Sequence, residues 1–294
     1  MENSYQLQIP SMSGFDLRYY FDNSPEKDEA RVFPPHVHDR LEFYALVEGN
    51  VSFMVENHLY RLQPGDVIVS KPNEIHNCIL NTDSVHQHLC FWFEATSDFL
   101  FSDFLTHEMG KGNLISPTES DKGRLLTLYY EIRQAGEEDQ KHRQLYLALE
   151  ILDILRRNME MQTESHSMPP LLREILDDVN ENFVAIGGLS YFTEKYYVSS
   201  STLNRLFQSH LHTTPKLYLE AKKLAYSRIL LKEGKSVMDA CVSAGFINCS
   251  NYIRLFKKRF HITPTEYKSG MGVMDMELSR IQSEGIQRIP QKDK

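Results

Sequence analysis

"NCSNYIRLFKKRF", residues 248–260, combines a polar start with four basic residues in its second half. Its aromatic and aliphatic residues recur at helical spacing, which predicts an amphipathic helix. A similar stretch, "SSSTLNRLFQSHL", occupies residues 199–211. Three side chains return after 49 positions: Arg205, Phe207 and His212 recur as Arg254, Phe256 and His261. The chain is therefore predicted to carry one helical unit twice.

Each copy predicts a short helix, a turn and a second helix with its own cap. In the first copy a helix begins near Leu189, a turn falls at Tyr197-Val198, and Ser199 caps the next helix. In the second copy Gly245 occupies the turn, where a positive φ or a close approach is expected, and Asn248 is the matching cap. This order describes a helix-turn-helix, whose second helix can enter the major groove of DNA.

The second helix of each copy has an apolar inner face and a polar outer face. The inner residues are Leu203, Leu206 and Phe207, then Tyr252, Phe256 and Phe260. The outer residues are Ser200, Ser201, Asn204 and Arg205, then Cys249, Ser250, Asn251 and Arg254. Arg and Asn suit bidentate contacts with guanine and adenine, whereas Lys257, Lys258 and Arg259 are expected at phosphates. An all-α bundle with solvated basic faces is the structural alternative, and the duplicated caps argue against it.

The segment from about Ile175 to Lys268 resembles the DNA-binding module of the AraC/XylS family of bacterial transcription regulators. The matching pieces are "LSYFTEKYYVSSSTLNRLF", "YLEAKKLAYSRILL" and "ACVSAGFINCSNYIRLFKKRFHITPTEYK". The resemblance implies two helix-turn-helix units joined by a rigid central helix at about 215–232. It also implies that the outer residues of both second helices face one side of double-stranded DNA.

Three features depart from the family pattern. His212 and His261 stand where the family usually has glycine, and a left-handed backbone is uncommon for residues other than glycine. Thr193 stands where alanine is usual, which is expected to loosen the first unit. The first recognition helix is rich in serine, so we expect weaker base readout from it than from the second.

Charge is distributed unevenly along the 294-residue chain, whose net charge is −8. Residues 171–270 hold 14 Lys/Arg against 9 Asp/Glu, whereas residues 1–170 hold 14 against 27. A basic module behind an acidic one suits nucleic-acid binding. No apolar run reaches the roughly 18–20 residues of a membrane span, and the N-terminus lacks a secretory pattern. A cytoplasmic protein without a membrane partner is expected.

The four cysteines are scattered along the sequence: Cys78, Cys90, Cys241 and Cys249. Their spacing forms no metal-binding pair. Disulfides between them are not expected, because thiols stay reduced in the cytoplasm.

Residues up to about 112 have the pattern of short strands. "LEFYALVEGNVSFMVENHLYRL" contains two β-rich runs separated by Glu48-Gly49-Asn50, which predicts a hairpin. "PGDVIVSKP" adds a short apolar strand between turns, and "VHQHLCFWFE" alternates. Short strands at this spacing predict an antiparallel barrel or sandwich.

"HVHDRLEFYALVEG" places His36, His38 and Glu42 before a glycine, and "PGDVIVSKPNEIH" ends at His76. Over residues 30–95 the pattern resembles the cupin motifs, which implies a small jelly-roll barrel. On a strand His36, His38 and Glu42 share one face, and imidazole and carboxylate groups suit a divalent metal. Four interpretations stay open: a metal-free effector site, a metal-bound sensor, a metal-dependent cupin enzyme, and side chains that only satisfy one another. We expect the first, with no cofactor, because regulators with such a front domain commonly sense sugars or other metabolites.

The run "VHQHLCFWFE" predicts a strand with two different faces. One face holds His86, His88, Cys90 and Trp92, and the other holds Leu89, Phe91 and Phe93. Aromatic walls beside a few polar groups suit a sugar-like ligand. The pattern does not decide which face looks inward. We expect the effector site to contain His36, His38, Glu42, His76, His88 and Trp92.

Helical periodicity begins near residue 121. Leucines at three- and four-residue steps predict two helices up to about 161. We expect their apolar stripes to be mostly core. The family resemblance implies a homodimer through this region, and a dimer would raise DNA affinity through effective concentration. "QTESHSMPP" then has the composition of a linker.

The sequence thus predicts an α+β, multidomain chain that is not an enzyme. Its expected parts are a cupin-like effector-sensing β-barrel (jelly roll) at 1–112, a helical dimerisation region and linker at 113–168, an all-α double helix-turn-helix at 169–270, and a tail at 271–294. The expected function is a DNA-binding regulator that a small-molecule effector controls, activating through RNA polymerase, with repression left open. A metal-binding cupin sensor or enzyme fused to a DNA-binding module is the alternative.

Overall fold

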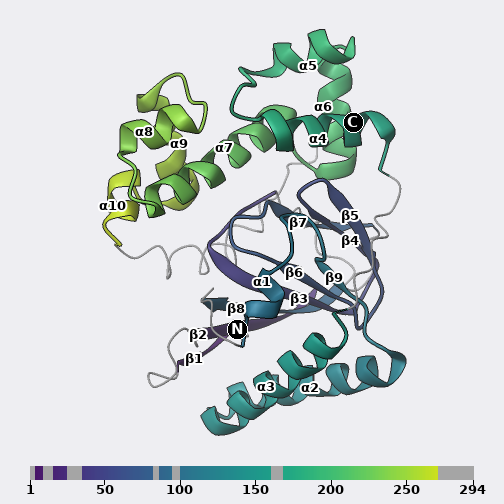
Figure 1. Cartoon of the computed structure of the whole chain (residues 1–294). Helices are drawn as coiled ribbons and strands as arrows, with labels where there is room; N and C mark the ends of the chain where they lie inside the picture. The colour runs from purple at the N-terminus through teal and green to yellow at the C-terminus, as the bar shows by residue number, and fades with distance from the viewer. Residues whose placement is uncertain are drawn as a thin grey trace. The chain divides into compact units, whose positions relative to one another are not determined.

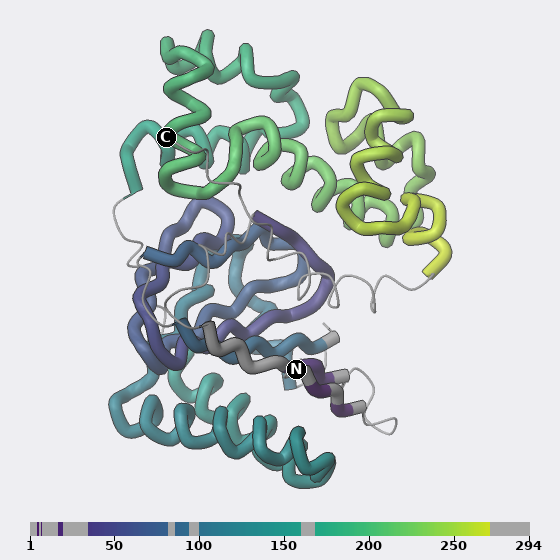
Figure 2. Tube along the Cα trace, turned by 180° about the vertical axis from the view of Figure 1, so that it is seen from behind, coloured from purple at the N-terminus to yellow at the C-terminus, as the bar shows by residue number. Residues whose placement is uncertain are grey.

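A computed structural model of the chain describes residues 4–8, 16–24, 35–81, 86–94, 100–159 and 168–270. Backbone contacts divide the chain into two units. The first comprises Met1–Ala30, Asp39–Glu74 and Leu80–His166, and the second comprises Arg31–His38, Ile75–Ile79 and Ser167–Lys294. Strands dominate the first unit and helices the second (Figures 1 and 2). The expected α+β class is confirmed, and the expected tail lies outside the described residues.

Six strands form the larger sheet in the order β1-β2-β8-β3-β6-β9, and each neighbouring pair is antiparallel. Their bounds are β1 Ser4–Gln8, β2 Asp16–Ser24, β3 Arg40–Glu48, β6 Val67–Ser70, β8 His86–Glu94 and β9 Leu114–Ile115. The register between β3 and β8 places Glu42 opposite Trp92 and Tyr44 opposite Cys90. Directly opposite residues share a face of the sheet. The polar residues of β3 and the predicted effector residues of β8 therefore point the same way.

The smaller sheet has the order β5-β4-β7, with β4 Val51–Val55, β5 His58–Leu62 and β7 His76–Leu80. The hairpin predicted at Glu48-Gly49-Asn50 is wrong, because β3 belongs to the larger sheet and β4 to the smaller. Both strands are buried along nearly their whole length, so each needs cover on both faces. The true hairpin comes one strand later, where β4 pairs with β5 across Glu56 and Asn57.

One face of the larger sheet packs against α2 (Glu119–Glu137) and α3 (Lys141–Arg157), which run side by side in both views (Figures 1 and 2). Leu89, Phe91 and Phe93 of β8 lie in this core. The helices contribute Leu125, Leu128, Tyr129, Ile132, Leu147, Ile151, Leu152 and Leu155. The expectation that these stripes are mostly core is confirmed. Because side chains alternate along a strand, His88 and Trp92 point to the opposite face.

Tyr19 and Gly136 fix how the two helices sit against the sheet. The Tyr19 hydroxyl lies 3.0 Å from both the Ile132 carbonyl oxygen and Gln144 Oε1. A Cβ on Gly136 would lie 2.6 Å from that hydroxyl, so only glycine leaves room for it. The contact ties β2 to both helices.

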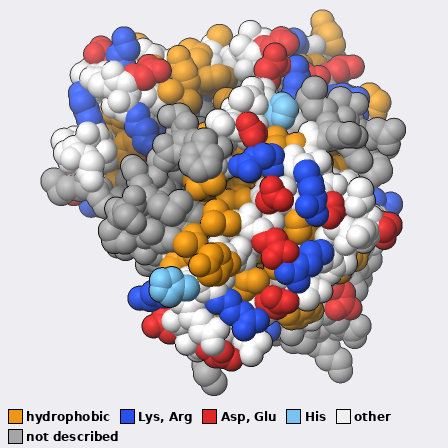
Figure 3. Space-filling model, turned by 60° about the horizontal axis from the view of Figure 1, so that its bottom comes forward, with side chains coloured by type: hydrophobic (Ala, Val, Ile, Leu, Met, Phe, Trp, Pro, Cys, Tyr) orange, Lys and Arg blue, Asp and Glu red, His pale blue; other side chains and the backbone are white. Residues whose placement is uncertain are grey.

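The outer side of α2 and α3 is mixed in character. Figure 3 brings the lower side of the Figure 1 view forward and shows basic, acidic and hydrophobic side chains interspersed. Arg124 of α2 pairs with Glu150 of α3 at 2.7 Å, and Tyr146 of α3 is 70% exposed. This outer side thus contains both ion pairs and an exposed aromatic side chain.

The second unit contains seven helices among residues 168–270. They are α4 Pro170–Asn182, α5 Leu189–Tyr196, α6 Ser200–Leu211, α7 Pro215–Lys232, α8 Val237–Ser243, α9 Cys249–Phe260 and α10 Pro264–Lys268. In Figure 1, α7 leads from the α4–α6 group to the α8–α10 group, as expected of the central helix. The two predicted caps are confirmed: Ser199 Oγ accepts from the Thr202 amide at 3.1 Å, and Asn248 Oδ1 accepts from the Asn251 amide at 2.9 Å.

The turns after and before the recognition helices need unusual backbone. His212 and His261 end α6 and α9 in the left-handed region, with φ of 50° and 62°. These histidines thus take the conformation that glycine favours. Gly245, between α8 and α9, has φ 80°, and a Cβ there would overlap the Val184 carbonyl oxygen. Both features expected of Gly245, a positive φ and a close approach, are confirmed.

Candidate nucleic-acid interface and interior polar cluster

The residues predicted to face DNA lie on the outer faces of α6 and α9. Ser200, Ser201, Asn204, Arg205, Ser250, Asn251 and Arg254 are exposed, and Cys249 is partly buried. The inner faces are buried through Leu203, Phe207, Tyr252, Phe256 and Phe260, while Leu206 is partly buried. Each helix therefore holds a polar ridge, defined by its four outer residues, on an apolar base.

Arg254 is oriented by a neighbour on its own helix. Its Nη2 donates to Asn251 Oδ1 at 2.7 Å, and both side chains are exposed. The pair presents a guanidinium and an amide together, the two groups best suited to base edges. The first turn of α6 is different, because Ser199 Oγ lies 2.8 Å from Ser201 Oγ. One of the α6 ridge hydroxyls thus contacts its own helix cap.

The basic residues at the end of α9 do not behave alike. Lys257 and Lys258 are exposed, as phosphate contacts would require. Arg259 is partly buried, and its Nη2 donates to the Pro35 carbonyl oxygen at 2.8 Å. The Arg259 guanidinium thus has a partner inside the protein, and the expectation that it meets phosphates stays a prediction.

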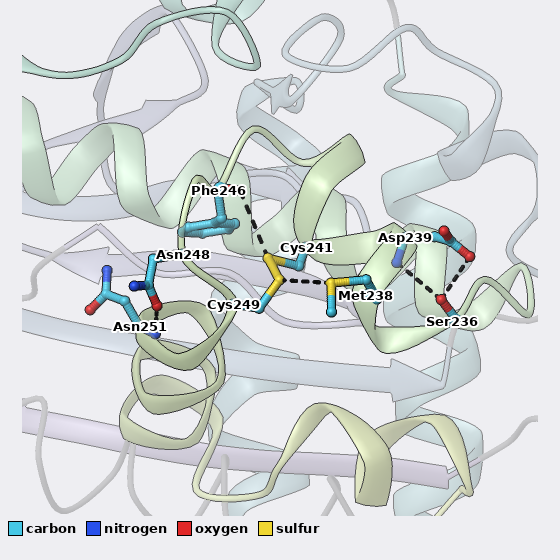
Figure 4. The surroundings of a disulfide bond; sticks show 8 residues. All are labelled: Ser236, Met238, Asp239, Cys241, Phe246, Asn248, Cys249 and Asn251. Atoms are coloured by element: carbon cyan, nitrogen blue, oxygen red, sulfur yellow. Dashed lines mark hydrogen bonds between the residues drawn. A yellow bond between two sulfur atoms is a disulfide. The ribbon is translucent and has the colours of Figure 1, made fainter.

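A disulfide joins Cys249, the first residue of α9, to Cys241 of α8 (Figure 4). The expectation of no disulfide is therefore wrong. The two residues lie eight positions apart, and the tight turn between the helices brings their Cα atoms to 5.9 Å. Cys249 Sγ also contacts Met238 Sδ at 3.3 Å. Sequence spacing alone hides such a pair, because only the turn geometry brings it together.

Three predicted effector-site histidines meet where β7 begins. His36 and His76 form an isolated antiparallel bridge, in which the backbone nitrogen of each residue lies 3.0 Å from the carbonyl oxygen of the other. The His76 ring centroid lies 4.3 Å from that of His36 and 4.9 Å from that of His38. The strand expected to run from His36 to Glu42 begins only at Arg40. The His36–His76 bridge, not a shared strand face, therefore brings the histidines together.

Glu42 completes a four-residue group with these histidines. One ligand atom from each of His36, His38, Glu42 and His76 lies within 4.8 Å of the others. Glu42 Oε2 accepts a hydrogen bond from Trp92 Nε1 at 2.7 Å, and both side chains are buried. Trp92 therefore orients the carboxylate, a role that the sequence did not indicate. The donor set of three imidazoles and one carboxylate suits Zn, Fe or Mn.

His88 belongs to a second interior group with Tyr44 and His86. The Tyr44 hydroxyl lies 2.6 Å from His86 Nε2, and the His88 ring stacks 4.7 Å from the rings of both neighbours. All three side chains are buried. Tyr44 was missed as a site residue, although it shares strand parity with Glu42 and could have been found from the alternation of β3.

Comparisons with known proteins cover both regions. The model "AraC-like ligand binding domain" matches residues 25–97, which include both interior groups, and the model "Helix-turn-helix domain" matches residues 192–270, which include both ridges. The chain belongs to the AraC family of transcription regulators.

Curated members of the AraC family align along most of this regulator. The HTH-type transcriptional activator RhaR of Mannheimia succiniciproducens is 23% identical over 245 residues, covering 81% of this chain and 87% of that protein. The activator RhaS of Enterobacter sp. (strain 638) is 22% identical over 264 residues, covering 84% and 93%. Both relatives are transcription regulators rather than enzymes. This AraC-family chain is likewise a DNA-binding regulator under effector control.

The solved structure of ToxT from Vibrio cholerae O395 aligns with 86% of this AraC-family chain and 97% of its own, at 12% identity and a TM-score of 0.36. Among the described residues, no helix is both long and apolar enough to span a bilayer.

Proposed function

We propose that this regulator reads DNA with the two polar ridges and senses a sugar-like or related metabolite with the two interior groups. The observation that carries the proposal is the repetition of the ridge: two capped helices expose matching polar faces 49 positions apart. Such helices can occupy successive major grooves of one duplex. The serines, Asn204, Asn251, Arg205 and Arg254 are the proposed base contacts, and Lys257 and Lys258 the proposed phosphate contacts.

The interior groups support a neutral, hydroxyl-rich effector. His36, His38, Glu42 and His76 provide hydrogen-bonding atoms that lie close together. Tyr44, His86 and His88 add stacked rings with polar edges. Rings with a few convergent polar groups suit the apolar faces and hydroxyls of a sugar. We assign the effector to these residues, with Trp92 orienting Glu42.

A divalent metal is the second candidate for the histidine group. A tetrahedral ion at about 2.0–2.2 Å from each ligand separates neighbouring ligand atoms by roughly 3–4 Å. The four ligand atoms already lie within 4.8 Å of one another, so modest side-chain rotations would gather them. A bound ion would supply a fixed positive charge that attracts an anionic or hydroxyl ligand.

Elemental analysis of protein purified without chelators separates these two candidates. Stoichiometric metal that is lost in His38→Ala but retained in His88→Ala would favour the ion. Metal-free protein that keeps its DNA binding would favour the small effector alone. His88 is the matched control because it is also a buried histidine but lies outside the four-residue group, where it stacks with Tyr44 and His86.

The proposed signal runs through the segment that carries His36 and His38. The Pro35 carbonyl oxygen accepts from Arg259 of α9 at 2.8 Å, and the Val37 carbonyl oxygen from Arg228 of α7 at 3.4 Å. An effector that repositions His36 or His38 would therefore change the acceptors of Arg228 in the central helix α7 and of Arg259 in α9. The proposed result is a population shift between arrangements with different DNA affinity.

Several partner assignments belong to the same proposal. A homodimer through the outer side of α3 is supported by Tyr146, a large aromatic side chain that is 70% exposed. Activation through RNA polymerase is supported by the names of the curated relatives, which are activators. The proposed location is the cytoplasm, because a regulator that binds chromosomal DNA works in the compartment that holds the DNA.

Selection from random duplexes tests the proposed DNA readout. The purified wild-type chain should enrich a motif with two recognition elements about one helical turn apart. Arg205→Ala should relax the element read by α6, and Arg254→Ala the element read by α9. Enrichment of identical motifs by both variants and the wild type would contradict the proposal.

A further inference from the structure

The disulfide between α8 and α9 lies at the edge of the second polar ridge. Cys249 is the first residue of α9 and one of its four outer positions, and its partner Cys241 is fully buried in α8. We propose that Cys241 and Cys249 form a reversible thiol–disulfide switch, in which oxidation by a hydroperoxide weakens the binding of α9 to specific DNA. The inference rests on the proposed role of α9 in base readout.

The first helix-turn-helix serves as an internal control for a structural role of the bridge. The positions 49 residues earlier hold Phe192 and Ser200, which cannot form a disulfide. The first helix-turn-helix still forms a capped helix pair, with Phe192 buried and Ser200 exposed. The fold of such a unit therefore does not need a sulfur bridge. A cysteine pair found in the second helix-turn-helix and not in the first is better explained by control of DNA binding than by stability of the fold.

Contacts other than the bridge hold the two cysteine backbones in place. Gly245 fits its turn tightly against Val184, and the Gly245 carbonyl oxygen accepts from Lys223 Nζ at 2.8 Å. The Phe246 and Tyr252 rings pack 5.0 Å apart between turn and helix. The separation of 5.9 Å between the cysteine Cα atoms, which is within the usual range for a disulfide, thus stays available in the reduced protein. The bond can form and break without refolding of the unit.

The two thiols differ in access and in electrostatic setting. Cys249 is partly exposed at the N-terminus of a 12-residue helix, a position that favours a thiolate. Cys241 is fully buried and bonded to Cys249. These are the properties of an attacking cysteine and its resolving partner. In the cytoplasm, where we propose that this regulator works, disulfides are transient and redox-sensing.

The oxidation balances as a two-electron step. The Cys249 thiolate attacks one peroxide oxygen, the O–O bond breaks, and the sulfenic acid forms with release of hydroxide, or an alkoxide from an organic hydroperoxide. The Cys241 thiol then loses its proton and attacks Cys249 Sγ, so that the S–S bond forms and water leaves. Two thiols and one hydrogen peroxide thus yield one disulfide and two waters. A dithiol reductant reverses the change by thiol–disulfide exchange.

Oxidation alters the ridge itself. In the disulfide, Cys249 Sγ points toward α8, where it contacts Cys241 and Met238 (Figure 4). In the reduced protein the Cys249 side chain is released from Cys241 and can turn to the duplex, while the backbone of α9 keeps its place. We expect the loss to affect base readout and to leave the phosphate contacts of Lys257 and Lys258 unchanged.

The test compares reduced and peroxide-treated full-length protein on the duplex recovered by selection. Peptide mapping without reductant should show the peptides of Cys241 and Cys249 linked with the loss of two hydrogens. Affinity for the selected duplex, measured by fluorescence anisotropy, should fall roughly three- to tenfold, while affinity for random duplex stays unchanged. Dithiothreitol should restore both properties.

Variants separate this switch from other oxidation. Cys249→Ser should make binding insensitive to peroxide, and Cys90→Ser, which removes a buried thiol of strand β8, should leave the sensitivity intact. Unchanged affinity after confirmed linkage, no linkage, or a peroxide response that survives in Cys249→Ser would each overturn the switch. Failure of the reduced protein to depend on Arg254 would instead overturn the proposed readout by α9.

Discussion

Arg254 is the side chain on which base recognition by the second ridge should depend most. Asn251 holds its guanidinium on the exposed face of α9. Arg254→Ala should therefore lower affinity for the selected duplex by about 1–3 kcal/mol and relax specificity at one base pair. Anisotropy titrations on selected and random duplexes measure both effects. An equal loss on both duplexes would show that Arg254 does not read a base.

Lys258 should behave differently, although it lies only one helical turn from Arg254. Its exposed ammonium at the end of α9 suits a phosphate. Lys258→Ala should weaken binding to all sequences alike and reduce the slope of log affinity against log salt by about one unit. Titrations at several salt concentrations give the slope. The same slope in variant and wild type would rule out the phosphate contact.

The side chains of the ridges could be predicted because helical periodicity fixes which residues face outward. The fates of Cys249 and Arg259 could not be predicted this way, since each depends on a partner outside its own helix. The same holds for Trp92 of β8, whose indole donates a hydrogen bond to Glu42 on the neighbouring strand β3. Periodicity decides the direction of a side chain, and only tertiary structure decides what it meets.

At the scale of the element, the α8–α9 turn depends on Gly245. Its positive φ and its contact with the Val184 carbonyl oxygen both exclude a side chain. Gly245→Ala should lower the free energy of unfolding by about 1–3 kcal/mol. Gly234→Ala is the matched control, because Gly234 has φ 89° with nothing within 4 Å of its added Cβ. Urea unfolding should show a larger loss for Gly245→Ala, and equal losses would contradict the packing argument.

Asp178 joins α4 to α5 and should make the first helix-turn-helix sensitive to acid. Burial would raise the pKa of Asp178, but hydrogen bonds from Lys195, Asn182 and Tyr191 outweigh it and hold the pKa below its usual 3.8. A carboxyl with a lowered pKa stabilises the fold above its unfolded pKa, and this contribution disappears as the pH falls through the folded value.

Asp178→Asn should therefore be less stable than the wild type near neutral pH. The difference should shrink as the pH falls below about 4. Thermal melts at a series of pH values measure it, with Glu181→Gln on the exposed side of α4 as the control. A difference that stays constant down to low pH would mean that the charge of Asp178 contributes nothing.

Elements defined by local chemistry could be predicted well. Ser199 and Asn248 were predicted as caps and are confirmed. His212 and His261 were noted only because the family resemblance places glycine there, and both have a left-handed backbone. The connection between β3 and β4 could not be predicted, because a glycine turn between two apolar runs suits either a hairpin or a crossing between sheets. Burial on both faces of these strands decides for the crossing.

At the scale of the whole molecule, the histidine group depends on contacts between distant parts of the chain. His36 and His76 meet through a backbone bridge that no local pattern encodes. The family resemblance, rather than the residues alone, brought these histidines into one predicted site. The bonds from Arg228 and Arg259 to the same segment had no sequence signal, since a basic residue near a recognition helix is expected to face DNA.

Arg259 offers the most direct test of this long-range arrangement. Because its Nη2 donates to the Pro35 carbonyl oxygen, Arg259→Ala should release the segment that carries His36 and His38. Hydrogen exchange of the amides of residues 36–38 should become faster, while the salt slope of DNA binding stays at the wild-type value. Lys257→Ala, in which an exposed neighbour is removed, should show the reverse: unchanged exchange and a slope lower by about one unit. If Arg259→Ala lowered the salt slope and left the exchange unchanged, the guanidinium would be a phosphate contact after all, and the proposed route from the histidines to α9 would lose its physical basis.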